Sequence, residues 1–590
     1  MRRLPFSRHA VALAATALSL WSPTSAGGQI APAPLSSRQT LRGRCNGETI
    51  TQIDTRSYPP GSTIAGDVWK TVSNAAGMQH ATTRPEVLLA YVRLEPGKAC
   101  IEKERSESER LLRGLRFIAS ANIRSVPDGP GLVRIVIETV DELPIVLGGG
   151  FDGWHLASLL LGTENLDGGG LGVEVSGELG GAYRNGYGAT IAQYGAFGRP
   201  YSLIAEAVQR PHGESWKLEL SNPFLTDLQF RSFHVGASSG NSYYRLVRPG
   251  ELEDGRRFVR RLSYDFGIGF RIGNPSTPGV VGFFGGLLMG EQIRTGDEAV
   301  QLTESGMIML PAVDSAARRA YPSLSVMRVA LAGGLRKIRF TTVSGFDALT
   351  ASQDMATGIQ VGILAGPSIA VTRGLGDVFV SGELYSGVGD TSRFAEFRLS
   401  MEGSANQSTQ GWQGLVISTK LALHERRSSR HTQTVNVEFS AIQHLFFPLN
   451  LSFEDHEGGL RGFQRSGLSG GRRAVLRLED RWILPVTRRA DFAIAGFSDI
   501  GQLWAGDAPY GVDSKINGSV GLSLLAAYPS GGKRLYRIDL AVPVVGDRAS
   551  RFEVRFSLSD RTRMFWREPN DIAIARTGAV PRNIGGWTPH

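Results

Sequence analysis

The chain has 590 residues, of which 74 are glycine, 41% are hydrophobic and 20% are charged, and its formal net charge is +9. It exceeds the usual size of one domain, and beyond its first residues no apolar run reaches the roughly 18 residues of a transmembrane helix, so transmembrane helices are not expected. Part of the positive charge comes from Arg2, Arg3 and Arg8, and no lysine-rich block or basic helix follows, so nucleic-acid binding is not expected.

Residues 1–26 have the pattern of a secretory signal peptide. They start with basic residues, continue with an apolar run over residues 10–20 and end with the small residues Thr24 and Ala26. The run is too short to span a bilayer, and Pro23 does not suit the alternative, a first core helix. Cleavage is expected after Ala26, and residues 27–48 form a linker.

Cys45 and Cys100 are the two cysteines of the chain. A secreted protein enters an oxidising compartment, where the separation of these residues suits a stabilising loop closure. The sequence therefore predicts a disulfide, with two free buried thiols as the alternative.

Residues 49–142 are expected to form a small α+β domain of one strand, two helical stretches and two strands. The clearest helix covers residues 102–115, where Glu and Arg recur at i+3 and i+4 on a solvated face. The last strand covers residues 132–140, in which apolar residues at 133, 135 and 137 alternate with their neighbours;. Residues 117–126 are either a free sheet edge, to which another chain could add a strand, or an internal strand.

Residues 143–566 consist of alternating segments of about ten residues separated by Gly, Asn, Asp and Pro turns, which is typical of a transmembrane β-barrel. A soluble sandwich alternates too, but the signal peptide, the length and the lack of a second hydrophobic face favour the barrel. About 440 residues allow roughly 16 strands. We therefore expect a mainly β protein, an antiparallel barrel preceded by one small α+β domain. The last strand contains the residues Arg551, Phe552, Glu553, Val554, Arg555 and Phe556.

A glycine-rich loop and a strictly alternating segment occupy residues 458–481. Leu476, Leu478 and Trp482 fall on one face of the expected strand, whereas the residues at 477, 479 and 481 are charged and fall on the other;. Three charges do not suit an ordinary core, so the charged face is expected to line a polar lumen. The residues expected to face lipid are Leu476, Leu478, Leu540, Val554 and Phe556.

The quartet Leu460, Arg461, Gly462, Phe463 resembles the V/L-R-G-F/Y signature of the BamA/TamA-type outer-membrane assembly factors, the POTRA-plus-barrel superfamily often labelled bacterial surface antigen. The segments ENLDGGG at 164–170 and FSDIGQLW at 497–504 resemble two further landmarks of these barrels, in the expected order. Residues 106–142 resemble a POTRA domain. One copy fits before the barrel, whereas factors of the BamA type carry several.

In these barrels the glycine loop folds into the lumen, and its arginine contacts carboxylates of the inner wall. The resemblance implies that Arg461 contacts Glu479 and Asp499, and a guanidinium fork matches carboxylates bidentately. The alternative is an exposed loop arginine. The resemblance also implies that the last strand, including residues 551–556, is one side of a lateral gate.

The function expected from the resemblance is that of an assembly factor, which receives client chains through its POTRA domain and inserts them through the barrel. Secretion transporters are an alternative, but they usually have two POTRA domains and a plugging N-terminal helix, which residues 27–49 are poorly suited to supply. A passive channel or structural surface barrel is the third possibility, although it has no need of a POTRA arm. The expected location is the bacterial outer membrane, with the POTRA domain in the periplasm. The expected partners are the lipid bilayer, unfolded outer-membrane or secreted clients and periplasmic accessory proteins.

No enzymatic pattern is found. His424 and Glu425 are followed by His431, which is not the spacing of an HExxH site, and Lys533 lacks the remaining residues of a phosphate loop;. No GxSxG elbow is present. An enzyme, a cofactor and a metal site are therefore not expected. Residues beyond Ser559 either prolong the last strand to Trp566 or lie in the periplasm, and residues 567–590 are assigned as a C-terminal tail.

Overall fold

The structure is a computed structural model that describes most of the chain after residue 42. The described ranges are 43–60, 81–152, 155–178, 185–210, 212–246, 255–273, 279–303, 306–310, 321–373, 377–406, 411–485, 490–546, 551–561 and 568–576. The chain divides into two compact units, Met1–Arg44 and Cys45–His590, and every element below belongs to the second. The expected signal peptide lies outside the described residues.

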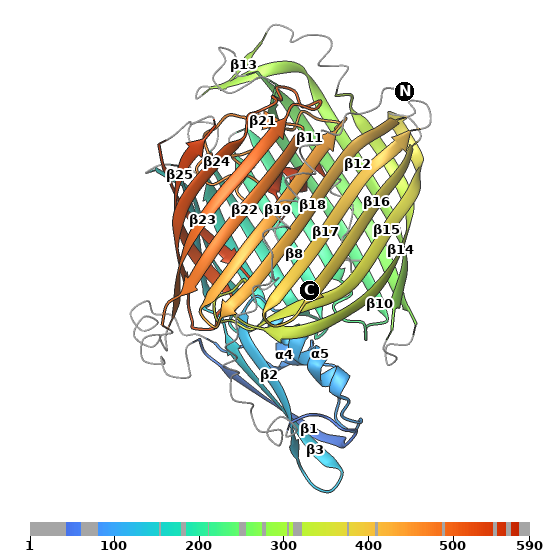
Figure 1. Cartoon of the computed structure of the whole chain (residues 1–590). Coiled ribbons are helices and arrows are strands. Elements are labelled where there is room, and N and C mark those ends of the chain that lie inside the picture. Colours follow the sequence, from blue (N-terminus) through green and yellow to red (C-terminus); the bar gives the residue numbers. More distant parts are fainter. Residues whose placement is uncertain are drawn as a thin grey trace. The chain divides into compact units, whose positions relative to one another are not determined.

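Twenty antiparallel strands close into a barrel in the described part of the chain (Figure 1). Neighbouring strands pair in chain order, and the last strand meets the first. The strands are β4 (Ile145–Asp152), β5 (His155–Leu166), β6 (Leu171–Glu178), β7 (Gly186–Ala196), β8 (Tyr201–Arg210), β9 (Gly213–Asn222), β10 (Arg231–Arg245), β11 (Arg256–Ile272), β12 (Val281–Thr303), β14 (Leu324–Val343), β15 (Gln353–Arg373), β16 (Asp377–Gly389), β17 (Arg393–Asn406), β18 (Gly411–Ser428), β19 (His431–Gln443), β22 (Arg472–Ile483), β23 (Asp491–Trp504), β24 (Asn517–Ala527), β25 (Arg534–Val545) and β26 (Glu553–Asp560). A short strand, β13 (Gly306–Met309), pairs with the end of β12.

The expected number of about 16 strands is wrong. Connections are shorter than that number assumed: β18 ends at Ser428 and β19 begins at His431, while β7 ends at Ala196 and β8 begins at Tyr201. Residues assigned to outer loops are instead in strands, and some strands are far longer than ten residues, since β12 has 23 and β15 has 21.

The outer face of the barrel is apolar. Leu478, Trp482 and Leu540 are 39%, 47% and 45% exposed, and Ile538 is 46% exposed. Directly opposed residues of neighbouring strands share a face, so Val554 and Phe556, which oppose Leu540 and Ile538, point outward as well. Leu476 opposes the exposed Ile500 in the same way. No helix within the described residues is long and apolar enough to cross a membrane.

The small N-terminal domain contains a three-stranded sheet in the order β1-β3-β2. Its strands are β1 (Thr49–Tyr58), β2 (Ile118–Pro127) and β3 (Leu132–Asp141), and its helices are α4 (Pro85–Leu89) and α5 (Glu102–Arg113). Leu88, Leu112, Ile118 and Ile135 are fully buried between the helices and the sheet. Because β3 is central, β2 is an edge strand, as one of the two sequence interpretations of residues 117–126 required.

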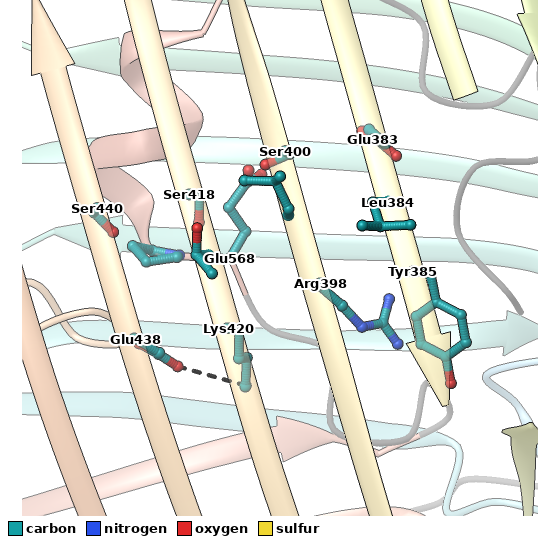
Figure 2. Close-up of a pocket in the computed structure, with 13 residues that line it drawn as sticks. Glu383, Leu384, Tyr385, Arg398, Ser400, Ser418, Lys420, Glu438, Ser440 and Glu568 are labelled. Atoms are coloured by element: carbon teal, nitrogen blue, oxygen red, sulfur yellow. Dashed lines mark ion pairs between the residues drawn. The ribbon is translucent and has the colours of Figure 1, made fainter. Parts of the chain in front are cut away.

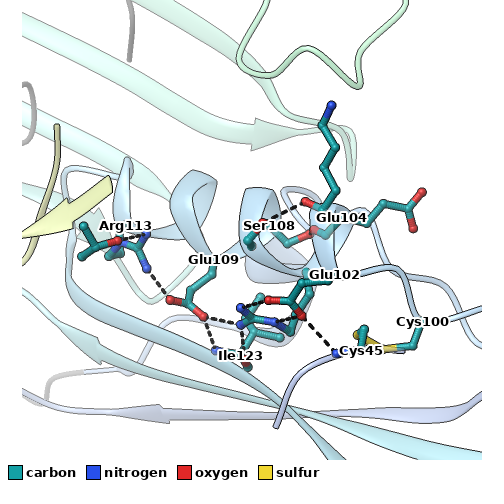
Figure 3. A network of polar contacts seen from close by, with 12 residues as sticks. Cys45, Cys100, Glu102, Glu104, Ser108, Glu109, Arg113 and Ile123 are labelled. Atoms are coloured by element: carbon teal, nitrogen blue, oxygen red, sulfur yellow. Dashed lines mark hydrogen bonds and ion pairs between the residues drawn. A yellow bond between two sulfur atoms is a disulfide. The ribbon is translucent and has the colours of Figure 1, made fainter. Parts of the chain in front are cut away.

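Side chains of α5 occupy the free edge of β2 at Ile123. Glu109 accepts a hydrogen bond from the Ile123 N–H at 3.2 Å, and Arg105 donates to the Ile123 carbonyl (Figure 3). Successive residues of an antiparallel strand direct their backbone groups to opposite sides, so these two groups point away from β3. Arg105 also contacts Glu109 at 2.7 Å. The ion pair therefore takes the place that a neighbouring strand would occupy.

A disulfide joins Cys45 to Cys100 across a sequence separation of 55 residues. Closing a loop of this length stabilises the folded domain by about 4 kcal/mol in the chain-entropy description. We expect the variant Cys45→Ser/Cys100→Ser to expose the small domain to limited proteolysis while the barrel stays resistant. Peptide mass spectrometry without reduction should find the linked Cys45 and Cys100 peptides, and alkylation of both thiols before reduction would contradict the pairing.

Helix α5 is also bonded to three separate places on the barrel, which are the turn before β10, the start of β15 and the residue just before β25. Glu107 accepts a hydrogen bond from Thr226 Oγ1 at 2.5 Å, and Arg113 forms a bidentate ion pair with Asp354, with distances of 2.7 and 3.1 Å. Lys533, just before β25, donates to the Arg113 and Ile118 carbonyls. Burial by itself would raise the pKa of Glu107, but the Arg110 guanidinium, the Thr226 hydroxyl and the Arg336 charge together hold this pKa below its ordinary value.

Candidate lumen site

The quartet Leu460, Arg461, Gly462, Phe463 lies in the loop between two short strands, β20 (Leu451–Ser452) and β21 (Ser469–Gly470). Leu460 and Phe463 are buried and anchor the loop in an apolar cluster with Phe453, Val475 and Leu503. Gly462 has a φ of +88°, a left-handed conformation that favours glycine. The two anchors and this turn hold the arginine between them against the inner wall.

Arg461 forms its shortest contacts with Asp499. Its Nε and Nη2 atoms donate to the two Asp499 carboxylate oxygens at 2.7 and 2.6 Å, and its backbone N–H donates to the same side chain at 3.2 Å. The guanidinium also lies 3.5 Å from the centre of the Phe497 ring, a cation–π contact. Asp499 is fully buried, so this pair is largely shielded from solvent.

Glu479 is close to Arg461 but is bonded more tightly to other arginines. The Arg461 Nη1 to Glu479 Oε2 distance is 3.5 Å, whereas Arg537 and Arg481 approach Glu479 at 2.8 and 2.7 Å. The structure thus brings Arg461, Glu479 and Asp499 together, but the bidentate contact of the Arg461 guanidinium is with Asp499 and not with Glu479. Glu479 instead connects the loop to β25.

Three site residues were not singled out from the sequence: Phe497, Arg537 and Asp539. Arg537 donates to Asp539 at 2.7 Å, and Asp539 lies 3.8 Å from Arg461. Both residues alternate with the exposed Ile538 and Leu540 along β25, so a period of two assigns them to its polar face;. The position of Phe497 depends on Gly521, since a Cβ at residue 521 would lie 2.3 Å from the ring, and no periodic pattern reveals such a cross-strand contact.

A cavity of about 150 Å³ adjoins this site inside the barrel. Charged side chains of both signs line it, including Lys420, Arg477, Glu438 and Asp347. Arg477 pairs with Glu438 at 2.8 Å and donates to the Gly459 carbonyl at 2.8 Å. The lumen is therefore polar and its charges are mutually compensated, which suits water and extended polar backbone more than an apolar ligand.

The last strand begins later than the sequence indicated, because β26 starts at Glu553 and leaves Arg551 and Phe552 in the preceding turn. Glu553 accepts a hydrogen bond from the Gln464 N–H at 3.0 Å, and Arg555 donates to the His456 carbonyl. Val554 and Phe556 are on the opposite, outward face. The inner face of the last strand is thus bonded to the loop that carries Arg461.

The described part of the C-terminal tail, residues 568–576, lies inside the barrel. It contains the short helix α7 (Asn570–Ala575), whose Ile572 and Ala575 are buried with Val416 and Ile442 of the wall. The described β26 ends at Asp560. A periplasmic position, one of the two expectations for this tail, does not describe residues 568–576, because wall charges in the lumen bind Asp571 and Arg576. A prolongation of the last strand to Trp566 would involve residues that lie outside the described ranges.

The fold and the site together define a class: a large closed antiparallel barrel with an apolar outer face, a small α+β domain at its N-terminal side and an arginine loop folded against its inner wall. No protein-family model matches the sequence, and no curated protein matches it.

Three of the solved structures that are similar to this chain have the following values. BamA from Haemophilus ducreyi lacking POTRA domains 1–3 has a TM-score of 0.38 and 11% identity over 87% of this chain and 85% of that one. CdiB from Escherichia coli has a TM-score of 0.43 and 12% identity over 87% and 76%, and CdiB from Acinetobacter baumannii has 0.40 and 9% over 87% and 74%. At these values the similarities assign neither an activity nor a client.

Proposed function

We propose that the chain is an outer-membrane assembly factor of the BamA/TamA type. In this proposal the barrel spans the outer membrane, the small domain is a single POTRA domain in the periplasm, and unfolded clients enter the bilayer at the junction of β4 and β26. The exposed apolar row of the barrel suits lipid, and the Cys45–Cys100 disulfide suits an oxidising compartment;.

The observation that carries the proposal is the length of the two strands that close the barrel. β4 and β26 have eight residues each, as β6 has, but among the described strands only at the β4–β26 junction are two strands of this length adjacent; the flanking β5 and β25 have 12 each. Fewer residues allow fewer ladder hydrogen bonds, and β4 contains three consecutive glycines at positions 148–150, which pack no side chain across the junction. This junction is therefore a favourable place for the barrel to open and for a client strand to pair.

Client chains would first bind to an edge of the small sheet by strand addition, in which main-chain hydrogen bonds supply affinity with little sequence selectivity. The edge of β2 is blocked at Ile123 by the Arg105–Glu109 pair. A client at β2 must displace this pair, and the residues of β1 form the other edge of the sheet.

A secretion transporter is the second candidate, and residues 568–576 in the lumen favour it, because an export path through the lumen needs a closure when it is idle. A passive channel fits less well, since the loop with Arg461 and α7 both fill space inside the barrel.

A crosslink across the junction tests the insertion route. A Cβ at residue 148 would lie 3.8 Å from Leu558 Cδ2, so Gly148→Cys/Leu558→Cys joined by a short thiol crosslinker would hold β4 and β26 together. Val435→Cys/Leu478→Cys is the matched control, because those residues are already paired in β19 and β22. We expect insertion of a barrel client into liposomes to stop in the first variant and to continue in the control. Equal insertion by both crosslinked proteins would overturn the lateral route.

Depletion of the protein followed by outer-membrane proteomics separates the candidate functions. An assembly factor predicts a broad loss of barrel proteins, a secretion transporter predicts the loss of one exported protein, and a channel predicts no change in either group.

A further inference from the structure

Residues 568–576 are attached to the inner wall at both ends of α7. At the start of the helix, Asp571 forms a bidentate ion pair with Arg473 of β22, with one distance of 3.0 Å, and its backbone N–H donates to Asp455 at 3.0 Å. At the end, Arg261 of β11 donates to the Arg576 carbonyl at 2.7 Å and to the Ile574 carbonyl. The segment is therefore bonded to strands that lie far apart around the barrel.

The wall carries charges that complement this segment. The Arg576 guanidinium lies 3.6 Å from Glu402 of β17 and 3.9 Å from Glu383 of β16, and it donates to Ser400. Glu568 contributes a third carboxylate, 3.1 Å from Arg576. Without Arg576, the two wall glutamates of neighbouring strands would lose a cation that lies between them. The charge of Asp571 is thus matched by Arg473, and the charge of Arg576 is matched by Glu402 and Glu383.

The fit is close. Ile572 is fully buried and Ala575 is 6% exposed, in one cluster with Val416, Ile442 and Leu451. Figure 2 shows Glu568 beside Ser400, among side chains from β16 to β19. The cavity between Glu568, Pro569 and these strands has a volume of about 30 Å³, enough for water but far too small for an unfolded chain.

We propose that residues 568–576 are a resident stopper of the barrel lumen, held by the Arg473–Asp571 and Arg576–Glu402 pairs and released as a unit. The stopper is built from the C-terminal side of the last strand, so a single chain carries both the pore and its closure. This proposal depends on the barrel having a lumen, but it does not depend on the proposed insertion of clients. Its test can therefore succeed or fail whatever the β4–β26 crosslinking experiment shows.

Conductance across planar bilayers tests the stopper in the full-length protein. We expect the variant Asp571→Asn/Arg576→Gln to conduct ions several-fold more often than the unchanged chain, with a larger effect at high salt, because salt screens the remaining wall contacts. Asn570→Ala is the matched control, since Asn570 lies on the exposed side of the same helix and its replacement should leave the conductance unchanged. Heat-dependent gel mobility verifies that each barrel is folded.

A peptide experiment identifies the site itself. A chain ending at Arg567 should conduct, and the added peptide EPNDIAIAR, which reproduces residues 568–576, should block it again. The same peptide with asparagine for the aspartate and glutamine for the arginine should not block. If the folded double variant and the shortened chain conduct no more than the unchanged protein, or if both peptides block equally, the proposed stopper is wrong.

Discussion

Replacing Arg461 by alanine is expected to lower the free energy of unfolding of the barrel by about 1.5 to 3 kcal/mol, the range for hydrogen bonds to charged groups. The variant removes both guanidinium contacts to Asp499 and the cation–π contact with Phe497. Asp499 would then be a fully buried carboxylate that has lost its closest cation. Its cross-strand neighbour Arg477 would not replace Arg461, because Arg477 is already bonded to Glu438. Water in the adjacent cavity moderates the loss, so the barrel should still fold.

A double-mutant cycle on the urea midpoint of heat-dependent gel mobility measures this interaction. Arg461→Ala and Asp499→Asn should be strongly non-additive, whereas Arg461→Ala and Glu479→Gln should couple less, because Glu479 retains Arg537 and Arg481. Arg461→Lys should restore little, since a point charge cannot form the bidentate contact. Arg465, an exposed arginine of the same loop, supplies the control. Additive effects of the first pair, or equal losses for Arg465→Ala and Arg461→Ala, would show that the loop is not held by Asp499.

The second large effect is expected at the outer face. Arginine at position 478 would place a charge in the hydrocarbon region and should cost about 2 to 4 kcal/mol near the midplane of the membrane. Thr434→Arg is the matched control, because Thr434 opposes Glu479 on β19 and lines the polar cavity next to the same strand pair. There the added guanidinium meets a carboxylate and water.

Folding yields of the two variants in lipid vesicles, measured by protease resistance, decide the assignment. We expect Leu478→Arg to fold poorly in lipid and Thr434→Arg to fold as well as the unchanged chain. Equal yields would mean that Leu478 does not face lipid. A reversed order would mean that the inside and the outside of the barrel are exchanged.

The parts of the fold that follow from local alternation could be predicted from the sequence. Leu478 and Glu479 are adjacent residues with opposite chemistry, and a period of two assigns each to its face without any knowledge of the partner strand. The position of Arg461 in the lumen came instead from the resemblance of its quartet, and its preference for Asp499 over Glu479 depends on side-chain geometry that spacing does not encode.

The tail and the strand number could not be predicted for a different reason. Helix α7 has six residues, less than two full turns, so it has no periodicity to detect, and Asp571 and Arg576 look like ordinary charges of a polar terminus. Their partners, such as Arg473, are about a hundred residues away in sequence. The strand number depends on the lengths of the connections between strands. A strand that continues beyond the membrane keeps the same alternation, so alternation does not show where the strand ends.

Helix α5 has a mechanical consequence for the barrel. It is bonded to the turn that precedes β10, to the start of β15 and to the start of β25, three points that lie well apart on the ring of strands. A ring that opens at one junction must widen, and a single helix of 12 residues, about 18 Å long at 1.5 Å per residue, does not lengthen with it. The rim cannot spread while all three attachments hold. Displacement of the small domain and separation of β4 from β26 are therefore expected to be one cooperative motion. A force that pulls the domain away from the barrel would allow the circumference of the barrel to increase.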